Sequence, residues 1–211
     1  MPKTHRYAEF TTLPNTYTYS YKDPALDMGL DLDRPIIAEL GCGSGIYTRE
    51  LATIHPQYQY IGIDMKSDRL HFGAKYCAAH GITNTKRLCA SVDHISSCFP
   101  EQSISEIWIT FPDPRPTRDR QKLTSPKYQA IYHALMKPGG VIHLKTDDKA
   151  FWDYSMKSLV DGGWIIRMYI EDIYKQTQKK LPEELLIQTY YEAQRLTQGR
   201  KIYYLQVYKQ D

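Results

Sequence analysis

Apolar residues along the chain fall into two patterns that alternate. One pattern is a short continuous run, rich in β-branched and aromatic residues and bounded by turn residues, which predicts a buried strand. We predict seven such strands, at residues 35–40, 58–63, 85–90, 104–111, 141–146, 164–170 and 202–208. The fourth run stops at Pro112 because proline cannot continue a strand ladder.

The stretches between these runs carry apolar residues three and four positions apart, which is typical of helices that cover a sheet. The four predicted helices present the apolar faces Tyr47/Leu51/Ile54, Leu70/Ala74/Cys77/Ala78, Tyr128/Ile131/Tyr132/Leu135 and Trp152/Met156/Leu159/Val160. Local signals mark their ends: Gly81 as a C-terminal cap, residues 125–126 as a start, residues 138–140 as a stop, and Asp147 with Asp148 as an N-terminal cap.

The order of these elements indicates the fold class. Strands that alternate with helices are joined by right-handed crossovers, which predicts a doubly wound α/β fold with a mostly parallel, seven-stranded sheet and helices on both faces. No repeat or long linker divides the chain, so we expect one domain at residues 34–211 after an N-terminal extension at residues 1–33. Ligands of such folds bind beyond the carboxyl ends of the strands. The segments expected to meet there are residues 39–45, 64, 91, 111–114 and 146–147.

Composition is that of a soluble globular protein. Hydrophobic residues make up 42% of the 211 residues and charged residues 24%, which excludes a disordered, collagen-like or coiled-coil chain. No apolar run approaches the ~20 residues that cross a bilayer, and the N-terminal charges are not followed by the apolar segment of a secretory signal. We therefore expect a cytoplasmic protein with no membrane partner. The net charge of +3 is too small by itself to indicate nucleic-acid binding.

Neither the cysteines nor the histidines show the spacing of a metal site. Cys42, Cys77, Cys89 and Cys98 lack a paired arrangement, so we expect reduced and mostly buried thiols. The seven histidines likewise lack metal-ligand spacing, and we expect no bound metal.

The segment Glu39-Leu40-Gly41-Cys42-Gly43-Ser44-Gly45 joins a predicted strand to a predicted helix. Glycines in that context allow a tight turn and the close approach of a ligand, although a turn without a ligand would use them too. Asp64 ends the next strand, 19 residues after Gly45, where a carboxylate can accept hydrogen bonds from both hydroxyls of a ribose or simply form a turn. A dinucleotide and S-adenosyl-L-methionine both suit this arrangement.

Glu39 distinguishes these two ligands. A carboxylate at the mouth of the loop repels the pyrophosphate of a dinucleotide, whereas the methionine end of S-adenosyl-L-methionine carries an ammonium and a sulfonium. The pattern E-x-G-x-G-x-G therefore favours a methyl donor. The other interpretation of Glu39 is a buried glutamate that is paired within the fold.

A second motif, Phe111-Pro112-Asp113-Pro114, follows the fourth predicted strand. Its two prolines restrict the backbone and present one carboxylate at the edge of the sheet. Residues 115–122 come next and contain four basic residues and one acidic residue. This composition is typical of a loop that binds phosphates, and the alternative is a solvated charged loop.

These motifs, followed by the late segment Thr189-Tyr190-Tyr191-Glu192, occur in the order found in the tRNA (guanine-N7)-methyltransferase family, which the chain resembles from Arg34 to Tyr203. The resemblance implies a Rossmann-like class I methyltransferase fold whose last strand is antiparallel. It implies transfer of a methyl group from S-adenosyl-L-methionine to N7 of a guanine in tRNA, in the variable loop at position 46, which forms 7-methylguanosine. The enzyme would be a monomer or a homodimer.

The resemblance also implies roles for individual residues. The methyl donor would contact Glu39, Gly41, Gly43, Gly45, Asp64, Ser91 and Asp113, with Asp113 at the reaction centre. The substrate nucleotide would be held by Asp147, Thr189, Tyr190, Tyr191 and Glu192. Two positions depart from the family pattern: Ser91 replaces an aspartate near the adenine, and Thr117 replaces a substrate-binding lysine, whose charge we assign to Arg118.

Guanine N7 has an in-plane lone pair and no proton, so orientation matters more than a general base. Asp113 or Asp147 can accept hydrogen bonds from guanine N1–H and the amino group, and the sequence does not choose between them. The alternatives are a methyltransferase for another substrate, a noncatalytic RNA-binding paralogue and a dinucleotide oxidoreductase. The basic loop disfavours the first, and the presence of Glu39 and Asp113 disfavours the other two.

Overall fold

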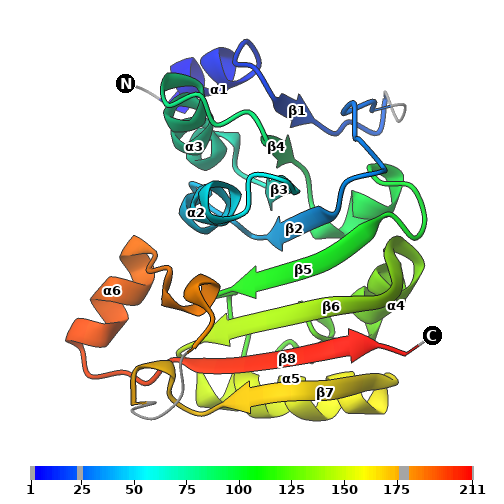
Figure 1. Ribbon diagram of the computed structural model, residues 1–211, viewed down its shortest axis with the longest axis vertical. Coiled ribbons are helices and arrows are strands. Elements are labelled where there is room, and N and C mark those ends of the chain that lie inside the picture. The colour runs from blue at the N-terminus through cyan, green and yellow to red at the C-terminus, as the bar shows by residue number, and fades with distance from the viewer. Residues whose placement is uncertain (1–2, 23–25, 176–180, 211) are drawn as a thin grey trace.

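The computed structural model describes residues 3–22, 26–175 and 181–210. Its helices are α1 (Lys3–Phe10), α2 (Ile46–Ile54), α3 (Ser67–Ala79), α4 (Pro126–Leu135), α5 (Lys149–Asp161) and α6 (Tyr190–Thr197), with short 3-10 helices η1 (Val92–Ser97), η2 (Asp119–Gln121), η3 (Ile173–Lys175) and η4 (Glu183–Leu186). Its strands are β1 (Thr16–Thr18), β2 (Ile36–Leu40), β3 (Gln59–Asp64), β4 (Thr85–Cys89), β5 (Ile104–Thr110), β6 (Met136–Thr146), β7 (Trp164–Ile170) and β8 (Tyr203–Lys209). All of these strands belong to one sheet, in the order β1-β4-β3-β2-β5-β6-β8-β7 (Figure 1).

The doubly wound, mostly parallel sheet predicted from the sequence is confirmed. Neighbours from β1 through β6 pair in parallel, and β8 is antiparallel to both β6 and β7, so the last strand has the expected direction. The sheet has eight strands rather than the predicted seven because Thr16–Thr18 pairs with residues 87–89 of β4. Three residues are too few to show a strand pattern in a sequence.

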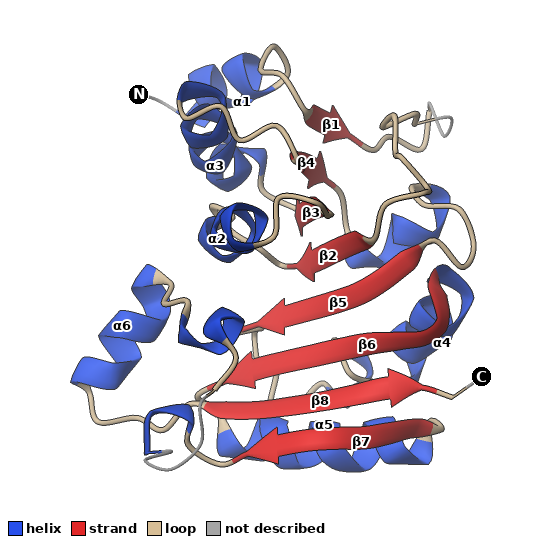
Figure 2. Ribbon diagram, in the orientation of Figure 1, coloured by secondary structure: helices blue, strands red, loops and turns tan. Residues whose placement is uncertain are grey.

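Helices cover both faces of the sheet, with α2 and α3 on one face and α4 and α5 on the other (Figure 2). Side chains of alternate residues of β2 lie on opposite faces of the sheet. Ala38 and Leu40 pack in one buried cluster with residues of α4 and α5, whereas Ile37 packs in a second cluster with residues of α2. Because side chains alternate along a strand, Glu39 shares the face of Ile37 and points toward α2.

Residues 138–140 do not end α4, as the sequence predicted, but lie within β6. The helix ends at Leu135, and Met136 already pairs with Ile104 at the start of β5. The pairing of β5 with β6 shifts register between Ile104 and Glu106, opposite the Pro-Gly-Gly segment. Such an irregularity lets a proline and two glycines remain inside a strand that the sequence pattern would end.

The other predicted helix ends are mostly confirmed. Gly81 follows α3 with a φ of +66°, and Asp148 caps α5 by accepting the N–H of Phe151 at 2.7 Å, whereas Asp147 does not cap it. Ser125 occupies the N-cap position of α4, but its hydroxyl donates to the carbonyl of Arg120 instead of capping the helix.

The four cysteines are free thiols and three of them are buried, as predicted. Within the described ranges, no helix has the length and apolar character needed to cross a bilayer. The same part of the chain contains no group of three or more His, Cys, Asp or Glu side chains arranged to bind a metal ion.

Candidate functional site

The glycine loop is the first component of the site, and it joins the carboxyl end of β2 to α2. Gly41, Gly43 and Gly45 have φ angles of +71°, +58° and +68°, a region that residues with a side chain adopt only with strain. Asp64, at the end of β3, accepts the N–H of Gly43 at 2.9 Å and the N–H of Lys66 at 2.8 Å. Its carboxylate therefore holds the loop in place from the neighbouring strand.

Glu39 is buried under this loop, with only 3% of its surface exposed. Its Oε2 atom accepts the N–H of Thr48 at 2.9 Å and the Thr48 hydroxyl, and its Oε1 atom accepts the Thr110 hydroxyl at 2.7 Å. Burial raises the pKa of Glu39, while the two threonines and the positive charge of Arg87 oppose that change. Glu39 is thus paired within the fold and also reaches the cavity described next.

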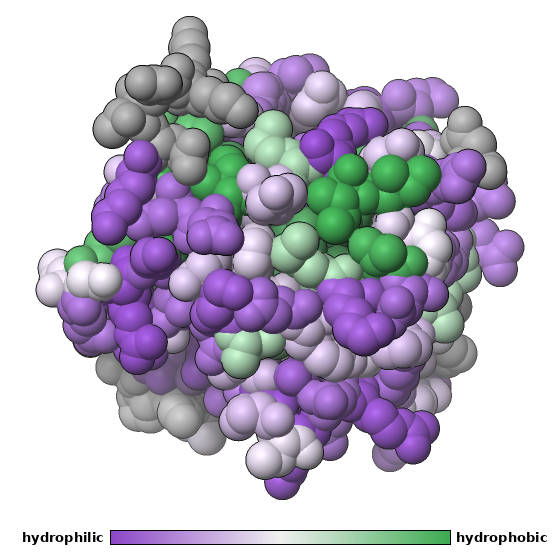
Figure 3. All heavy atoms as spheres, turned by 90° about the horizontal axis from the view of Figure 1, so that it is seen from below, coloured by the Kyte–Doolittle hydropathy of each residue, from purple (hydrophilic) through white to green (hydrophobic). Residues whose placement is uncertain are grey.

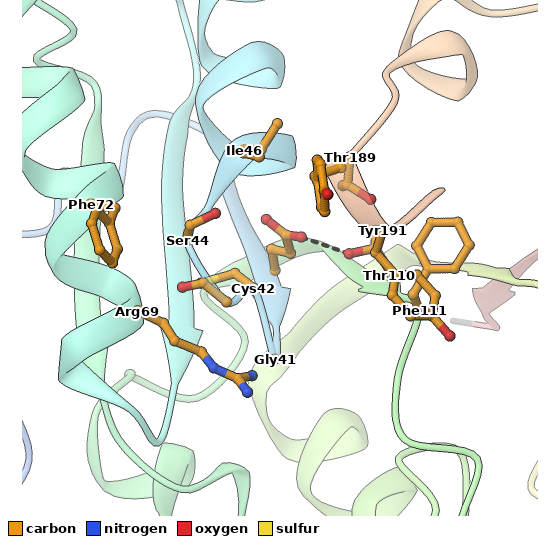
Figure 4. Close-up of a pocket in the computed structure, with 13 residues that line it drawn as sticks. Gly41, Cys42, Ser44, Ile46, Arg69, Phe72, Thr110, Phe111, Thr189 and Tyr191 are labelled. Carbon is orange, nitrogen blue, oxygen red and sulfur yellow. Dashed lines mark hydrogen bonds between the residues drawn. The ribbon is translucent and has the colours of Figure 1, made fainter. Parts of the chain in front are cut away.

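A cavity of about 390 Å³ opens beside the loop at the carboxyl edge of the sheet, which is large enough for a small molecule. Figure 4 shows Arg69 and Phe72 of α3 on one side of it, and Phe111 and Tyr191 on the other. The complete lining is Glu39, Gly41, Cys42, Gly43, Ser44, Ile46, Arg69, Phe72, Thr110, Phe111, Thr189, Tyr190 and Tyr191. Four segments far apart in the sequence therefore meet around one space.

The structure brings only some of the predicted site residues to this cavity. Those that line it are Glu39, Gly41, Gly43, Thr189, Tyr190 and Tyr191. Those that lie outside its lining are Gly45, Asp64, Ser91, Asp113, Thr117, Arg118, Asp147 and Glu192. Ser91, one of these outlying residues, lies two positions after the end of β4 and is the N-cap of η1. Its hydroxyl oxygen accepts the N–H of Asp93.

The F-P-D-P segment leaves β5 with an unusual backbone, because Phe111 and Arg115 have φ angles of +48° and +43°. Asp113 is exposed, and its carboxylate lies 3.6 Å from the Nε atom of Arg115. Thr117 and Arg118 are also exposed. Lys122 differs from the other bases of the loop, since it is 7% exposed and lies 2.7 Å from the carboxylate of Asp119.

The segment around α6 closes the opposite side of the cavity. Thr189 is the N-cap of α6 and accepts the N–H of Glu192 at 3.1 Å, while Tyr190 is 80% exposed. Asp147 lies 3.3 Å from the Nε atom of Arg195, which links the end of β6 to α6.

Glu192 points in the other direction, into the protein. Its carboxylate forms an ion pair with Lys145 at 2.9 Å and accepts the hydroxyl of Tyr174 at 2.9 Å, with no exposed surface. Burial raises the pKa of Glu192 and lowers that of Lys145, and the attraction between the two charges opposes both changes. The pair anchors α6 to β6.

Sequence reasoning missed Arg69 and Phe72, which stand three residues apart on α3. Phe72 is 56% exposed, although it lies in a helix whose apolar face packs on the sheet. An aromatic residue outside the predicted apolar face was the available signal. It could not be used because the predicted face Leu70/Ala74/Cys77/Ala78 shows which side of α3 packs on the sheet, but not which distant segments lie near Phe72 in the fold.

The parallel sheet with an antiparallel β8, and an acid-led glycine loop at the carboxyl edge of β2, together define a Rossmann-like methyltransferase. Residues 33–205 match the family model described as "Putative methyltransferase". The chain belongs to the tRNA (guanine-N7)-methyltransferase family. The enzyme of that name from Christiangramia forsetii is 39% identical over 176 residues, which cover 82% of this chain and 78% of that protein. The enzyme of that name from Bacteroides fragilis is 32% identical over 216 residues, which cover 96% and 84%.

Solved structures with low sequence identity share the fold. The 16S rRNA methyltransferase KamB superposes with a TM-score of 0.64 at 13% identity, over 84% of this chain and 88% of that one. An antibiotic-related methyltransferase superposes with a TM-score of 0.60 at 18% identity, over 89% of this chain and 96% of that one. At such identities the likeness concerns the fold alone.

Proposed function

We propose that the protein transfers a methyl group from S-adenosyl-L-methionine to N7 of a guanine in tRNA and forms 7-methylguanosine. The observation that carries this proposal is the cavity in which Glu39 and the glycine loop face Thr189, Tyr190 and Tyr191. In this cavity the glycine loop lies opposite the Thr-Tyr-Tyr segment, and that arrangement supports a methyl donor and a nucleotide bound next to each other. Relatives named for this reaction, at up to 39% identity among those described above, support the same conclusion.

The donor half of the site is assigned to the loop side of the cavity. Glu39 and the backbone of Gly41 and Gly43 would hold the methionine end, whose ammonium is complementary to a buried carboxylate. Asp64 lies outside the cavity lining, but it supports Gly43 and retains acceptor capacity for the hydroxyls of the ribose. Ser91 would lie near the adenine, and Gly45, which is buried, would act by shaping the loop.

The substrate half is assigned to the α6 side and to the loop after β5. Exposed Tyr190 and Tyr191 offer aromatic surfaces on which a guanine can stack. Asp113 and Asp147 follow the carboxyl ends of the neighbouring strands β5 and β6, and either can accept from the N1–H and amino group of guanine. Thr117 and Arg118 would contact the RNA backbone, because both are exposed beside Asp113.

The chemistry asks for alignment more than for proton transfer. S-adenosyl-L-methionine supplies an electrophilic methyl group on a sulfonium, and the N7 lone pair of guanine needs no base to expose it. The protein therefore contributes by fixing two ligands in line, which accounts for several kcal/mol of the barrier on an order-of-magnitude scale. Glu192 then acts indirectly: by holding Lys145 and α6, it positions the tyrosines.

The finer parts of the proposal concern the tRNA position and the assembly. We infer that the target is the variable-loop guanine at position 46 and that the enzyme works as a monomer or homodimer. Mass spectrometry of nucleosides from unmodified tRNA, incubated with the protein and the methyl donor, tests the reaction. A tRNA with adenine at position 46 is the matched control. Methylation of that control, or of protein in place of RNA, would redirect the assignment to another substrate.

A further inference from the structure

Arg87, in the middle of β4, is a buried charged side chain next to the glycine loop, with 1% of its surface exposed. Its Nη2 atom donates to the carbonyl of Gly45 at 3.4 Å and lies 3.4 Å from the Sγ atom of Cys77 on α3. Its Nε and Nη1 atoms have no hydrogen-bond partner in the described part of the chain. The guanidinium therefore sits between the glycine loop and α3.

Three glycines from three different elements surround this guanidinium. A Cβ atom on Gly45 of the loop would lie 2.9 Å from Cζ of Arg87, one on Gly62 of β3 would lie 3.0 Å from Nη1, and one on Gly73 of α3 would lie 3.0 Å from Nε. Gly62 and Gly73 have no positive φ that would call for glycine. The close approach of Arg87 acts at Gly62 together with Cys42 Sγ and Thr48 Oγ1, which lie equally near at 3.0 Å. At Gly73 it acts together with the carbonyl of Ser44, which lies still nearer.

A buried cation without a paired carboxylate is costly unless other charges compensate it. No ion pair joins Arg87 to an acidic residue within the ranges described. Glu39 on β2 and Arg87 on β4 are both register partners of Gly62 on the strand between them, so the two side chains lie on the same face of the sheet. The positive charge of Arg87 favours the charged form of Glu39. The other buried cation near Glu39 is Lys145 on β6, which is already bound to Glu192.

The other groups around Glu39 are neutral, namely Thr48 and Tyr47 of α2, Thr110 of β5 and Cys42 of the glycine loop. A further cation, Arg69 of α3, lines the same cavity as Glu39. Of the two buried cations near Glu39, Arg87 and Lys145, only Arg87 is not already bound to another carboxylate.

We propose that Arg87 is a positioning residue of the methyl-donor site: its guanidinium braces the glycine loop against α3 and supplies the charge that balances Glu39. This role rests on the proposed function in one respect, namely that Glu39 receives the ammonium of the donor. Loss of the charge then makes Glu39 easier to protonate, and a protonated Glu39 binds an ammonium poorly. Donor affinity in a neutral variant should consequently fall as the pH falls.

The test is calorimetric titration of the full chain with S-adenosyl-L-methionine between about pH 5.5 and pH 7, where the amino group of the donor stays protonated. Arg87→Met and Arg87→Gln remove the charge, Arg87→Lys keeps it, and Lys86→Met on the same strand is the matched control. We expect the two neutral variants to lose about tenfold in affinity across this range, since each pH unit below the pKa of a required carboxylate costs up to tenfold. The wild type, Arg87→Lys and the control should change little.

Glu39→Gln, alone and combined with Arg87→Met, distinguishes a failure of the inference about Arg87 from a failure of the donor-binding role of Glu39. The combined variant should show no dependence on pH beyond that of Glu39→Gln alone. If the neutral variants are less stable but keep the wild-type pH profile, Arg87 is a structural residue only and the inference is overturned. If Glu39→Gln binds the donor as well as the wild type, the assignment of Glu39 in the proposed function fails first.

Discussion

The Nζ atom of Lys145 lies 2.9 Å from Oε1 of Glu192, and neither side chain is exposed to solvent. The pair connects the carboxyl end of β6 to the first turn of α6, whose Tyr190 and Tyr191 line the cavity. Glu192, the last residue of the late motif at residues 189–192, therefore contributes to the site by holding α6 in position and does not line the cavity.

Removing one partner of this pair leaves an uncompensated buried charge, so Lys145→Met should lower the free energy of unfolding by about 3 to 5 kcal/mol. Urea denaturation provides the measurement. The double variant Lys145→Met/Glu192→Gln should recover part of the loss, because no buried charge remains. A Glu192→Gln variant with wild-type stability but no tRNA binding would instead indicate a direct contact with the nucleotide.

Donor binding should depend on the two carboxylates at the loop. Losing hydrogen bonds from a buried or charged group costs roughly 1.5 to 3 kcal/mol, so Glu39→Ala and Asp64→Ala should raise the dissociation constant of S-adenosyl-L-methionine about tenfold to a hundredfold. Asp64→Ala should also loosen the loop, because Gly43 loses its acceptor. Calorimetry measures both effects, with exposed Glu101→Ala as the control. Unchanged affinity in both variants would contradict the location of the donor.

The basic loop should supply contacts to phosphates that depend steeply on salt. Each lost phosphate contact lowers the slope of log affinity against log salt by roughly 0.7 to 0.9, so Arg118→Ala/Arg120→Ala should reduce the slope for tRNA by up to about two units. Lys122→Ala is the internal comparison: Lys122 is buried against Asp119, so it should affect stability and leave the slope intact. An unchanged slope in Arg118→Ala/Arg120→Ala would place the RNA surface elsewhere.

Asp113→Asn should lower turnover while donor affinity stays near that of the wild type. An amide oxygen accepts hydrogen bonds more weakly than a carboxylate. The NH₂ group of asparagine is also a donor, so it cannot pair with the N1–H and amino donors of guanine. If that contact contributes ~2 to 4 kcal/mol in the transition state, kcat/KM for tRNA falls about thirtyfold to a thousandfold.

The stability of the Asp113→Asn variant should not change, because Asp113 is exposed. Asp147→Asn in the same assay decides which carboxylate matters more. Asp147 is paired with Arg195, so its loss should also disturb α6. Wild-type kcat/KM in Asp113→Asn would remove that residue from guanine recognition.

Much of the fold could be predicted because its signals are local and continuous. Buried parallel strands are apolar on both faces, so runs such as 36–40 stand out, and each crossover helix adds its own period. The strand Thr16–Thr18 had no such signal, since it is short and is defined by hydrogen bonds to β4. The end of α4 was misjudged because the partner strand β5 accommodates an irregular Pro-Gly-Gly segment.

The same distinction between local signals and contacts of distant segments applies to the site. The sequence by itself determined the glycine loop and the acids that follow neighbouring strands, because chain order and strand direction suffice to send them to one edge of the sheet. The late motif of α6 was expected there only from the resemblance to the family. Only the tertiary structure decided which way each side chain turns: Glu192 inward to Lys145, Phe72 and Arg69 toward the cavity, and Arg87 beneath three glycines. These directions depend on packing between segments far apart in the chain, and no local pattern of residues contains that information.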